Sequence, residues 1–186
     1  MANPASATIP ERPFGRLLGL KKHEYVAVAW SFAYFACVMT SYFMLRPMRE
    51  TMGVESGVTT IPFLFTSTFF VMLLVTPVFG WIASRFPRRK FLPWVYAFFA
   101  SNILCFYAAF SYADATNTDI VWIGRGFFVW ISVFNLFVVS VFWSFMADIY
   151  TREQGRRLFG VISAGGSAGA LIGPLITGLL VVPIGF

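Results

Sequence analysis

Three arginines, Arg46, Arg49 and Arg125, are the residues of this chain best suited to bind a ligand. A guanidinium group binds phosphate or carboxylate through two parallel hydrogen bonds and stays charged at any working pH. Each of the three lies beside a long apolar segment. The positive charge of these side chains favours an anionic ligand. A second interpretation stays open for each, because arginine at a membrane interface extends its charge into water at low cost. Arg46 also has Glu50 four residues further on as an ion-pair partner.

Polar side chains inside the apolar segments extend this candidate site. Helical periodicity places several of them on one broad face of the first segment: Ser31, Tyr34, Ser41, Tyr42 and Arg49, with Arg46 at its edge. The same periodicity places Arg125, Ser132 and Asn135 on one face of the fourth segment. Polar residues within a membrane usually face protein or a cavity. We therefore predict a substrate-binding set of six residues: Tyr34, Tyr42, Arg46, Arg49, Arg125 and Asn135.

The acidic residues argue against one class of transporter. Glu11 lies in the N-terminal tail, and the others fall at segment ends or in loops: Glu24, Glu50, Glu55, Asp114, Asp119, Asp148 and Glu153. No carboxylate is therefore placed at mid-membrane to couple protons or to bind a lipophilic cation. Cation-drug antiport is disfavoured, unless a part of the protein beyond this sequence supplies the acid.

Other reactive side chains predict no enzyme. His23 is the one histidine, and no serine, aspartate or cysteine group completes a catalytic set around it. Cys37 and Cys105 lie inside apolar blocks, where cysteine commonly serves as a small buried residue. We expect no catalytic residue, no metal site and no cofactor.

The composition indicates which elements position these residues. Hydrophobic residues make up 58% of the 186 residues and charged residues 12%, against about 45–50% and about 25% in soluble domains. The apolar residues form blocks of about 20, the length that crosses a bilayer as a helix. We predict an all-α, polytopic transmembrane bundle over residues 24–186, preceded by a tail over residues 1–23 that is either a surface amphipathic helix or disordered. Its five spans are residues 25–45, 61–83, 91–112, 120–147 and 158–182.

The loops predict the orientation of the bundle. With the N-terminus in the cytoplasm, eleven Lys and Arg residues lie on the cytoplasmic side and three on the other. Cytoplasmic loops carry the excess of basic residues, so we expect a cytoplasmic N-terminus. The basic clusters adjoin the spans and read as topology signals, so the net charge of +6 does not indicate nucleic-acid binding.

A motif between the second and third spans suggests a family. The run GWIASRFPRRK, from Gly80 to Lys90, resembles the cytoplasmic loop signature of the major facilitator superfamily, G-x-L-A-D-R-x-G-R-R/K. Ser84 replaces the family's Asp, and Pro87 replaces a Gly. In that family the Asp and Arg residues form an ionic latch in the outward-facing state, so Ser84 puts the details of the latch in doubt. The resemblance implies a cytoplasmic gate of five residues: Gly80, Arg85, Arg88, Arg89 and Asp148. Enforcement of topology alone is the other interpretation of the loop.

The fifth span carries small residues at helical spacing: Gly165, Gly166, Gly169, Gly173, Pro174 and Gly178. Small residues let two membrane helices approach closely, so Gly165, Gly169, Gly173 and Pro174 are predicted packing residues. The run from Gly169 to Pro174 resembles the glycine-rich signature of this span in several facilitator families. No other span offers an obvious partner for this face, and we expect the partner to lie in a part of the protein beyond this sequence.

A narrower resemblance covers about Tyr25 to Gly178. The segments 41–54, 142–148 and 153–160 look like those of bacterial permeases related to the ATP/ADP translocases. This resemblance implies nucleotide exchange, and it supports the architecture better than it supports a substrate.

The sequence therefore predicts the N-terminal portion of a facilitator-type transporter, multi-pass in the inner membrane, that carries an organic anion by alternating access. Its expected partners are the lipid bilayer, a small anionic substrate and a C-terminal half of the same transporter. An alternative prediction is a non-transporting membrane scaffold or assembly subunit that binds a partner through the glycine face of the fifth span.

Overall fold

The computed structural model describes residues 24–85 and 88–184, with the side chains of residues 88–90 and 181–184 left out. The predicted tail over residues 1–23 lies outside this part. The described residues form five long helices and no strand: α2 (Tyr25–Glu55), α3 (Ile61–Arg85), α4 (Arg88–Thr116), α5 (Val121–Ile149) and α6 (Arg152–Ile184), with a short 3₁₀ helix, η2 (Val58–Thr60), between α2 and α3. All five long helices are apolar and long enough to cross a membrane. The predicted all-α bundle is confirmed.

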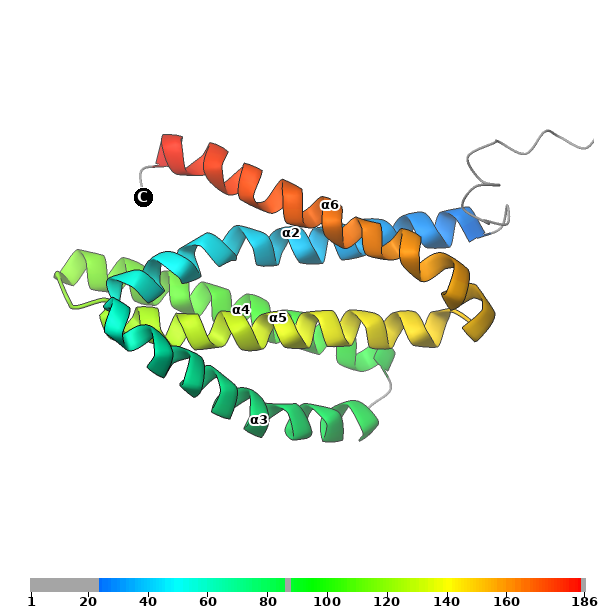
Figure 1. The fold of residues 1–186 in the computed structure, drawn as a ribbon, viewed down its shortest axis with the longest axis horizontal. Coiled ribbons are helices and arrows are strands. Elements are labelled where there is room, and N and C mark those ends of the chain that lie inside the picture. The colour runs from blue at the N-terminus through cyan, green and yellow to red at the C-terminus, as the bar shows by residue number, and fades with distance from the viewer. Residues whose placement is uncertain (1–23, 86–87, 185–186) are drawn as a thin grey trace, which may run out of the picture.

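Successive helices run in opposite directions along one long axis (Figure 1). One end of the bundle, here the Glu24 end, holds the start of α2 and the turn between α5 and α6. The opposite Glu55 end holds the end of α2 and the start of α5. This alternation is what a chain of bilayer-spanning helices with short loops requires.

The helices extend beyond the predicted membrane spans. The helix α2 continues through Pro47 to Glu55, and the Thr51 hydroxyl donates a hydrogen bond to the Pro47 carbonyl at 3.1 Å. Likewise α6 begins at Arg152, six residues before the predicted start of its span at residue 158. A span is bounded by the depth of the hydrocarbon layer, whereas a helix continues into the interface while its backbone bonds are satisfied.

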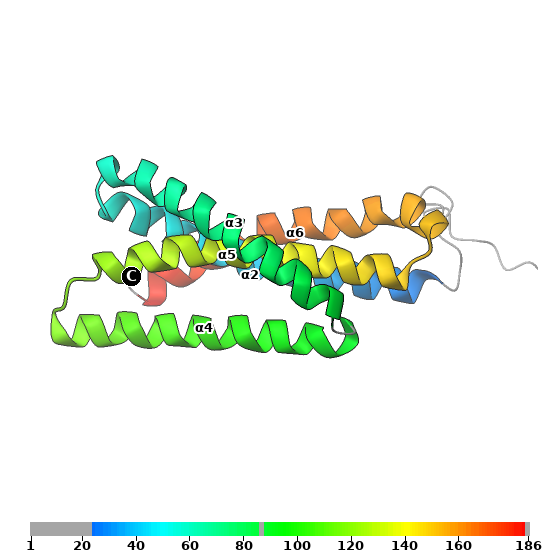
Figure 2. The same ribbon diagram turned by 90° about the horizontal axis from the view of Figure 1, so that it is seen from below.

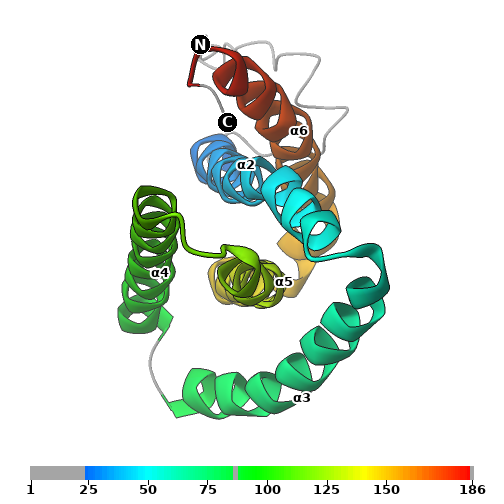
Figure 3. The same ribbon diagram turned by 90° about the vertical axis from the view of Figure 1, so that its left-hand side faces the viewer.

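The helix α5 occupies the centre of the bundle, with α2, α3 and α4 around it (Figure 3). Its inward residues Phe128, Ile131 and Phe142 are almost completely buried. Phe142 stacks on Phe35 of α2, with ring centres 4.3 Å apart. Burial of these large rings supplies the close packing that holds membrane helices together.

The glycine face of α6 packs along α2. A Cβ added at Gly165 would lie 2.4 Å from the Phe32 carbonyl oxygen, and one at Gly169 would lie 2.4 Å from that of Ala36. Near the Glu55 end, the Thr177 hydroxyl donates a hydrogen bond to the Met44 carbonyl at 3.2 Å. The expectation that this face has no partner among the other spans is therefore wrong, because α2 covers it. A scaffold that binds a separate subunit through this face is not supported.

The helices α3 and α4 pack on α5 at the edge of the bundle. Figure 2 shows α4 running beside the bundle along its length while α3 crosses α5 at an angle. Phe79 of α3 contacts Phe137 of α5 at 4.4 Å between ring centres, and Phe99 of α4 contacts Phe134 at 5.1 Å. Both helices carry large exposed apolar residues, among them Phe69, Leu74, Trp94 and Leu104. Such surfaces suit lipid.

Candidate functional site

Arg49 is held at the junction of three helices at the Glu55 end. Its side chain is 13% exposed. The guanidinium carbon lies 4.3 Å from the centre of the Phe128 ring on α5 and 5.8 Å from that of Phe65 on α3. Its Nη1 lies 3.8 Å from Glu50 Oε1, whereas its buried Nε has no hydrogen-bond partner among the described residues. The Arg49 guanidinium is thus held in a restricted site with hydrogen-bonding capacity unused.

Arg46 sits in a different environment, although it is only three residues away. Its side chain is 51% exposed, and its Nε lies 3.9 Å from Glu50 Oε1. The predicted pairing with Glu50 is confirmed. An exposed pair at this distance contributes little to stability, about 0–1 kcal/mol. Arg46 therefore resembles an interface arginine more than a binding-site arginine.

Arg125 lies in the first turns of α5, also at the Glu55 end. Its guanidinium carbon stands 4.6 Å from the centre of the Trp122 ring, three residues earlier on the same helix. Its buried Nε has no hydrogen-bond partner in the described part of the chain. The structure thus brings all three predicted arginines to one end of the bundle and leaves two of them with a buried, unpaired Nε.

The remaining predicted substrate residues lie deeper in the bundle. Tyr34 of α2 is half-buried and donates a hydrogen bond to the Tyr96 hydroxyl on α4. Tyr42 is buried against Phe43, and Asn135 is half-buried on α5. The polar stripe predicted on α2 is divided in the structure, because Ser31 and Tyr42 point into the core while Ser41 is exposed.

Tyr34 also borders a small cavity. About 230 Å³ in volume, it lies between α2 and α5 and is also lined by Trp30, Ser31 and Tyr150. Ser31 and Tyr150 are joined by a hydroxyl–hydroxyl hydrogen bond of 2.9 Å. Tyr34 precedes Arg49 by about four helical turns, or roughly 22 Å. One small metabolite cannot contact both residues at once.

The predicted gate residues gather at the Glu24 end. Arg85 is exposed at the end of α3, with its guanidinium carbon 5.1 Å from the centre of the Trp81 ring. Asp148 is exposed near the end of α5, and Gly80 is exposed with no atom within 4 Å of an added Cβ. Ser84, which replaces the family's Asp, donates its hydroxyl to the Trp81 carbonyl at 2.8 Å. The side chains of Arg88 and Arg89 lie outside the described residues.

An ion pair at the Glu24 end escaped the sequence reasoning. Glu24 is only 3% exposed, and Arg157 Nη2 lies 3.3 Å from its Oε1. The same oxygen accepts a hydrogen bond from the Gln154 side chain at 3.0 Å. These contacts join the start of α2 to the first turns of α6. An acid directly before an apolar span was the available signal.

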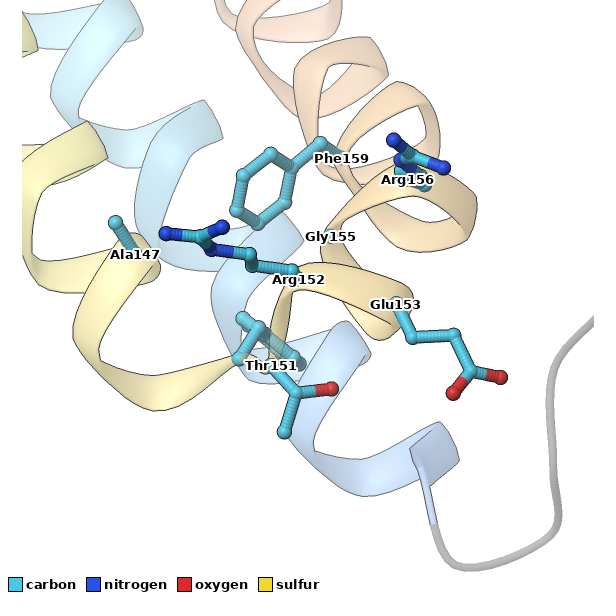
Figure 4. Close-up of a pocket in the computed structure, with 8 residues that line it drawn as sticks. Ala147, Thr151, Arg152, Glu153, Gly155, Arg156 and Phe159 are labelled. Carbon is cyan, nitrogen blue, oxygen red and sulfur yellow. The ribbon is translucent and has the colours of Figure 1, made fainter.

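The start of α6 is itself capped by Thr151 and Gln154. The Thr151 N–H donates to Gln154 Oε1 at 3.0 Å, and the Gln154 N–H donates to Thr151 Oγ1 at 3.3 Å. This reciprocal arrangement is a capping box, which satisfies two backbone donors at the helix start. Together with Tyr150, Thr151 borders an open cavity of about 580 Å³ at the same end (Figure 4).

No group of three or more His, Cys, Asp or Glu residues lies close enough to hold a metal ion in the described ranges 24–85 and 88–184.

The sequence model of the Major Facilitator Superfamily matches residues 30–186, which is most of the chain. This chain belongs to the major facilitator superfamily. A search of the curated proteins and a search of the solved structures gave no match. The family match begins within α2 and continues through α6. The protein is therefore a multi-pass membrane transporter of the facilitator type, and the family predicted from the loop motif is confirmed at this level.

Proposed function

We propose that this chain forms the N-terminal portion of a facilitator-type transporter that moves an organic anion across the inner membrane by alternating access. In such a mechanism two helical bundles rock about a site near the middle of the membrane. The described helices supply part of one bundle, and a C-terminal half of the same transporter supplies the other. The N-terminus of this chain faces the cytoplasm in this proposal.

The environment of Arg49 is the observation that carries the proposal. Stacking on Phe128 fixes the guanidinium in place. Its ion pair with Glu50 is loose, with 3.8 Å between Arg49 Nη1 and Glu50 Oε1. An anion that replaces this loose contact gains charge-assisted hydrogen bonds at little cost in ordering, because the arginine is already held. Arg125, with its own unpaired Nε, adds a second positive charge at the same end.

The two ends of the bundle have different tasks in this scheme. Arg49 and Arg125 attract the anion at the Glu55 end, which faces outward. Tyr34 and its cavity receive a substrate roughly 22 Å closer to the Glu24 end. Arg85 and Asp148, with Arg88 and Arg89, form the cytoplasmic gate.

Nucleotides, or other phosphorylated metabolites, are the proposed substrates. Phosphate is the group that a fixed guanidinium binds bidentately. The segment 41–54, which resembles permeases related to the ATP/ADP translocases, also contains Arg46 and Arg49. The residues that carry the resemblance are thus among those that carry the positive charge.

Transport by proteoliposomes tests the proposal. The full-length protein is reconstituted, and uptake and counterflow of labelled ATP, ADP, inorganic phosphate and sugar phosphates are measured. Arg49→Gln should lower uptake of the preferred anion by about tenfold or more, since a hydrogen-bonded charge contributes about 1.5–3 kcal/mol. Arg49→Lys keeps the positive charge but loses the bidentate geometry of the guanidinium, so it should retain part of the activity.

Thr59→Ala is the matched control, since Thr59 is exposed at the same end and outside the predicted site. The proposal fails if no anion shows uptake or counterflow with the wild-type protein. The assignment of Arg49 fails separately if Arg49→Gln transports as well as wild type.

A further inference from the structure

The turn between α5 and α6 borders an open cavity that the proposed transport residues do not use. Its volume is about 580 Å³, and its walls include Tyr150, Thr151, Arg152, Gly155, Arg156 and Phe159. The cavity lies at the Glu24 end, opposite to Arg49. Cavities of about 300–1,000 Å³ enclose drug-sized molecules, so this one has room for much more than a single small ion.

One wall of the cavity is aromatic. The Phe159 ring makes edge-to-face contacts with Trp143 at 5.4 Å and with Tyr150 at 6.2 Å between ring centres. Trp and Tyr gather where a membrane helix leaves the hydrocarbon layer. Because this cluster lies where α5 ends and α6 begins, we expect the cavity to lie at the depth of the lipid headgroups.

The cavity is lined by two arginines, Arg152 and Arg156, and by one acid, Glu153, so its net charge is positive. Gln154 and Arg157 are engaged by Glu24. Arg152 and Arg156 are exposed, and neither has an ion-pair partner in the part of the chain that the structure describes. In Figure 4 the Arg152 side chain extends toward Ala147, beneath the Phe159 ring, while the Glu153 side chain, which also lines the cavity, extends in the opposite direction.

We propose that this cavity binds the phosphate headgroup of an anionic phospholipid. Basic pockets between membrane helices on the cytoplasmic side bind such headgroups, and a guanidinium is well matched to phosphate. The size of the cavity favours a phosphate carried by a glycerol headgroup over a free ion. The acyl chains of this lipid then lie along the apolar surface below, where Ile149 is exposed. The bound lipid stabilises the turn between α5 and α6, which lies between Asp148 and the Glu24–Arg157 pair.

Lipid titration of the purified full-length protein tests this site. The affinities for phosphatidylglycerol and phosphatidylcholine are measured in detergent by native mass spectrometry. Wild type should prefer phosphatidylglycerol, and the double variant R152Q/R156Q should lose about 25-fold in affinity for it, or about fivefold for each arginine. R152K/R156K should lose much less, because both charges remain.

Arg85→Gln is the matched control, since Arg85 is an exposed arginine at the same end but stacks on Trp81 outside the cavity. Its affinity for phosphatidylglycerol should stay within about twofold of wild type. Unfolding temperatures measured in phosphatidylcholine show whether each variant is folded.

Three outcomes would overturn the proposal. The first is equal affinity of the wild type for the two lipids. The second is an equal loss in R85Q and R152Q/R156Q, which would mean that surface charge acts without a site. The third is displacement of phosphatidylglycerol by millimolar inorganic phosphate, which would assign the cavity to a soluble anion. None of these measurements depends on the transported substrate.

Discussion

Arginine has different tasks in this protein according to what surrounds each side chain. Arg49 is stacked on Phe128 and largely buried, whereas Arg46, one turn earlier, is half exposed. Arg157 reaches a buried carboxylate, and Arg152 crosses an open cavity. Arginine thus lies exposed at the end of the bundle as Arg46 and joins two helices as Arg157. We propose that Arg49 binds the transported anion and that Arg152 binds a lipid headgroup. The local contacts distinguish these roles, since the charge itself is identical.

Loss of the Glu24 carboxylate should destabilise the bundle. Glu24→Ala removes the acceptor that Arg157 and Gln154 share. Because Arg157 is 30% exposed, the cost should fall below about 3 kcal/mol, the lower end of the range for a fully buried pair. The thermal unfolding of the purified protein in detergent measures this loss. Arg156→Ala, an exposed neighbour on the same helix, should change the unfolding temperature much less.

A double-mutant cycle with Arg157→Ala isolates the pair. The double variant should be more stable than the sum of the two single losses predicts, because each single substitution already removes the interaction between the two residues. Strictly additive losses would contradict a direct interaction between Glu24 and Arg157.

At the scale of the helices, α2 and α6 form one unit. They are joined near the Glu24 end by Glu24 and Arg157, in the middle by the glycine face, and near the Glu55 end by Thr177 and Met44. Close backbone contact over this length leaves no room for one helix to slide against the other. We expect α2 and α6 to move together in any transport cycle.

A methyl group on the glycine face should separate these helices. In Gly169→Ala the new Cβ meets the Ala36 carbonyl oxygen at 2.4 Å and the Thr40 nitrogen at 2.8 Å. Both are backbone atoms that cannot rotate away, so a loss of about 1–3 kcal/mol in the free energy of unfolding is expected. Chemical unfolding in mixed micelles measures it.

Gly178→Ala is the matched control on the same helix, because no atom lies within 4 Å of its added Cβ. Alanine favours the helix over glycine by about 0.5–1 kcal/mol, so this variant should be equally or more stable than wild type. Equal destabilisation by both substitutions would show that the contact with α2 does not govern the effect, because helix propensity alone favours alanine at both positions.

At the scale of the molecule, the bundle has two chemically different ends. The Glu24 end holds Arg85, Asp148, the Glu24–Arg157 pair and the cavity lined by Arg152, while the Glu55 end holds Arg46, Arg49 and Arg125. The antiparallel order of the helices (Figure 1) produces this separation. A carrier with a gate at one end and an anion-attracting entrance at the other fits this distribution.

Cysteine labelling tests the proposed orientation. With Cys37 and Cys105 replaced by serine, single cysteines are placed at Thr59 or Ala115 at the Glu55 end, or at Glu153 at the Glu24 end, all of them exposed positions. A membrane-impermeant maleimide should label Thr59→Cys and Ala115→Cys in intact cells, and Glu153→Cys only after permeabilisation. The reverse pattern would place the N-terminus outside and contradict the distribution of basic residues.

The sequence alone determined which elements this protein has. Five apolar blocks of bilayer length predicted five helices, and the run from Gly80 to Lys90 predicted the family that the sequence match confirms. Hydrophobicity, periodicity and short motifs are properties of neighbouring residues, so they are visible before any folding is considered. The pairing of Arg46 with Glu50 was predictable for the same reason.

Only the tertiary structure decided what those elements face. Glu24 and Arg157 are 133 positions apart, and no local pattern connects them. The glycine face gave a correct expectation of close packing but a wrong one about its partner, since the choice of α2 depends on how two helix surfaces fit. Arg46 and Arg49 carry the same charge in the same motif. Their environments differ because Arg49 contacts Phe128, which is distant in the sequence and close in the fold. Contacts between helices depend on shape across the whole bundle, which is why local sequence could not predict them.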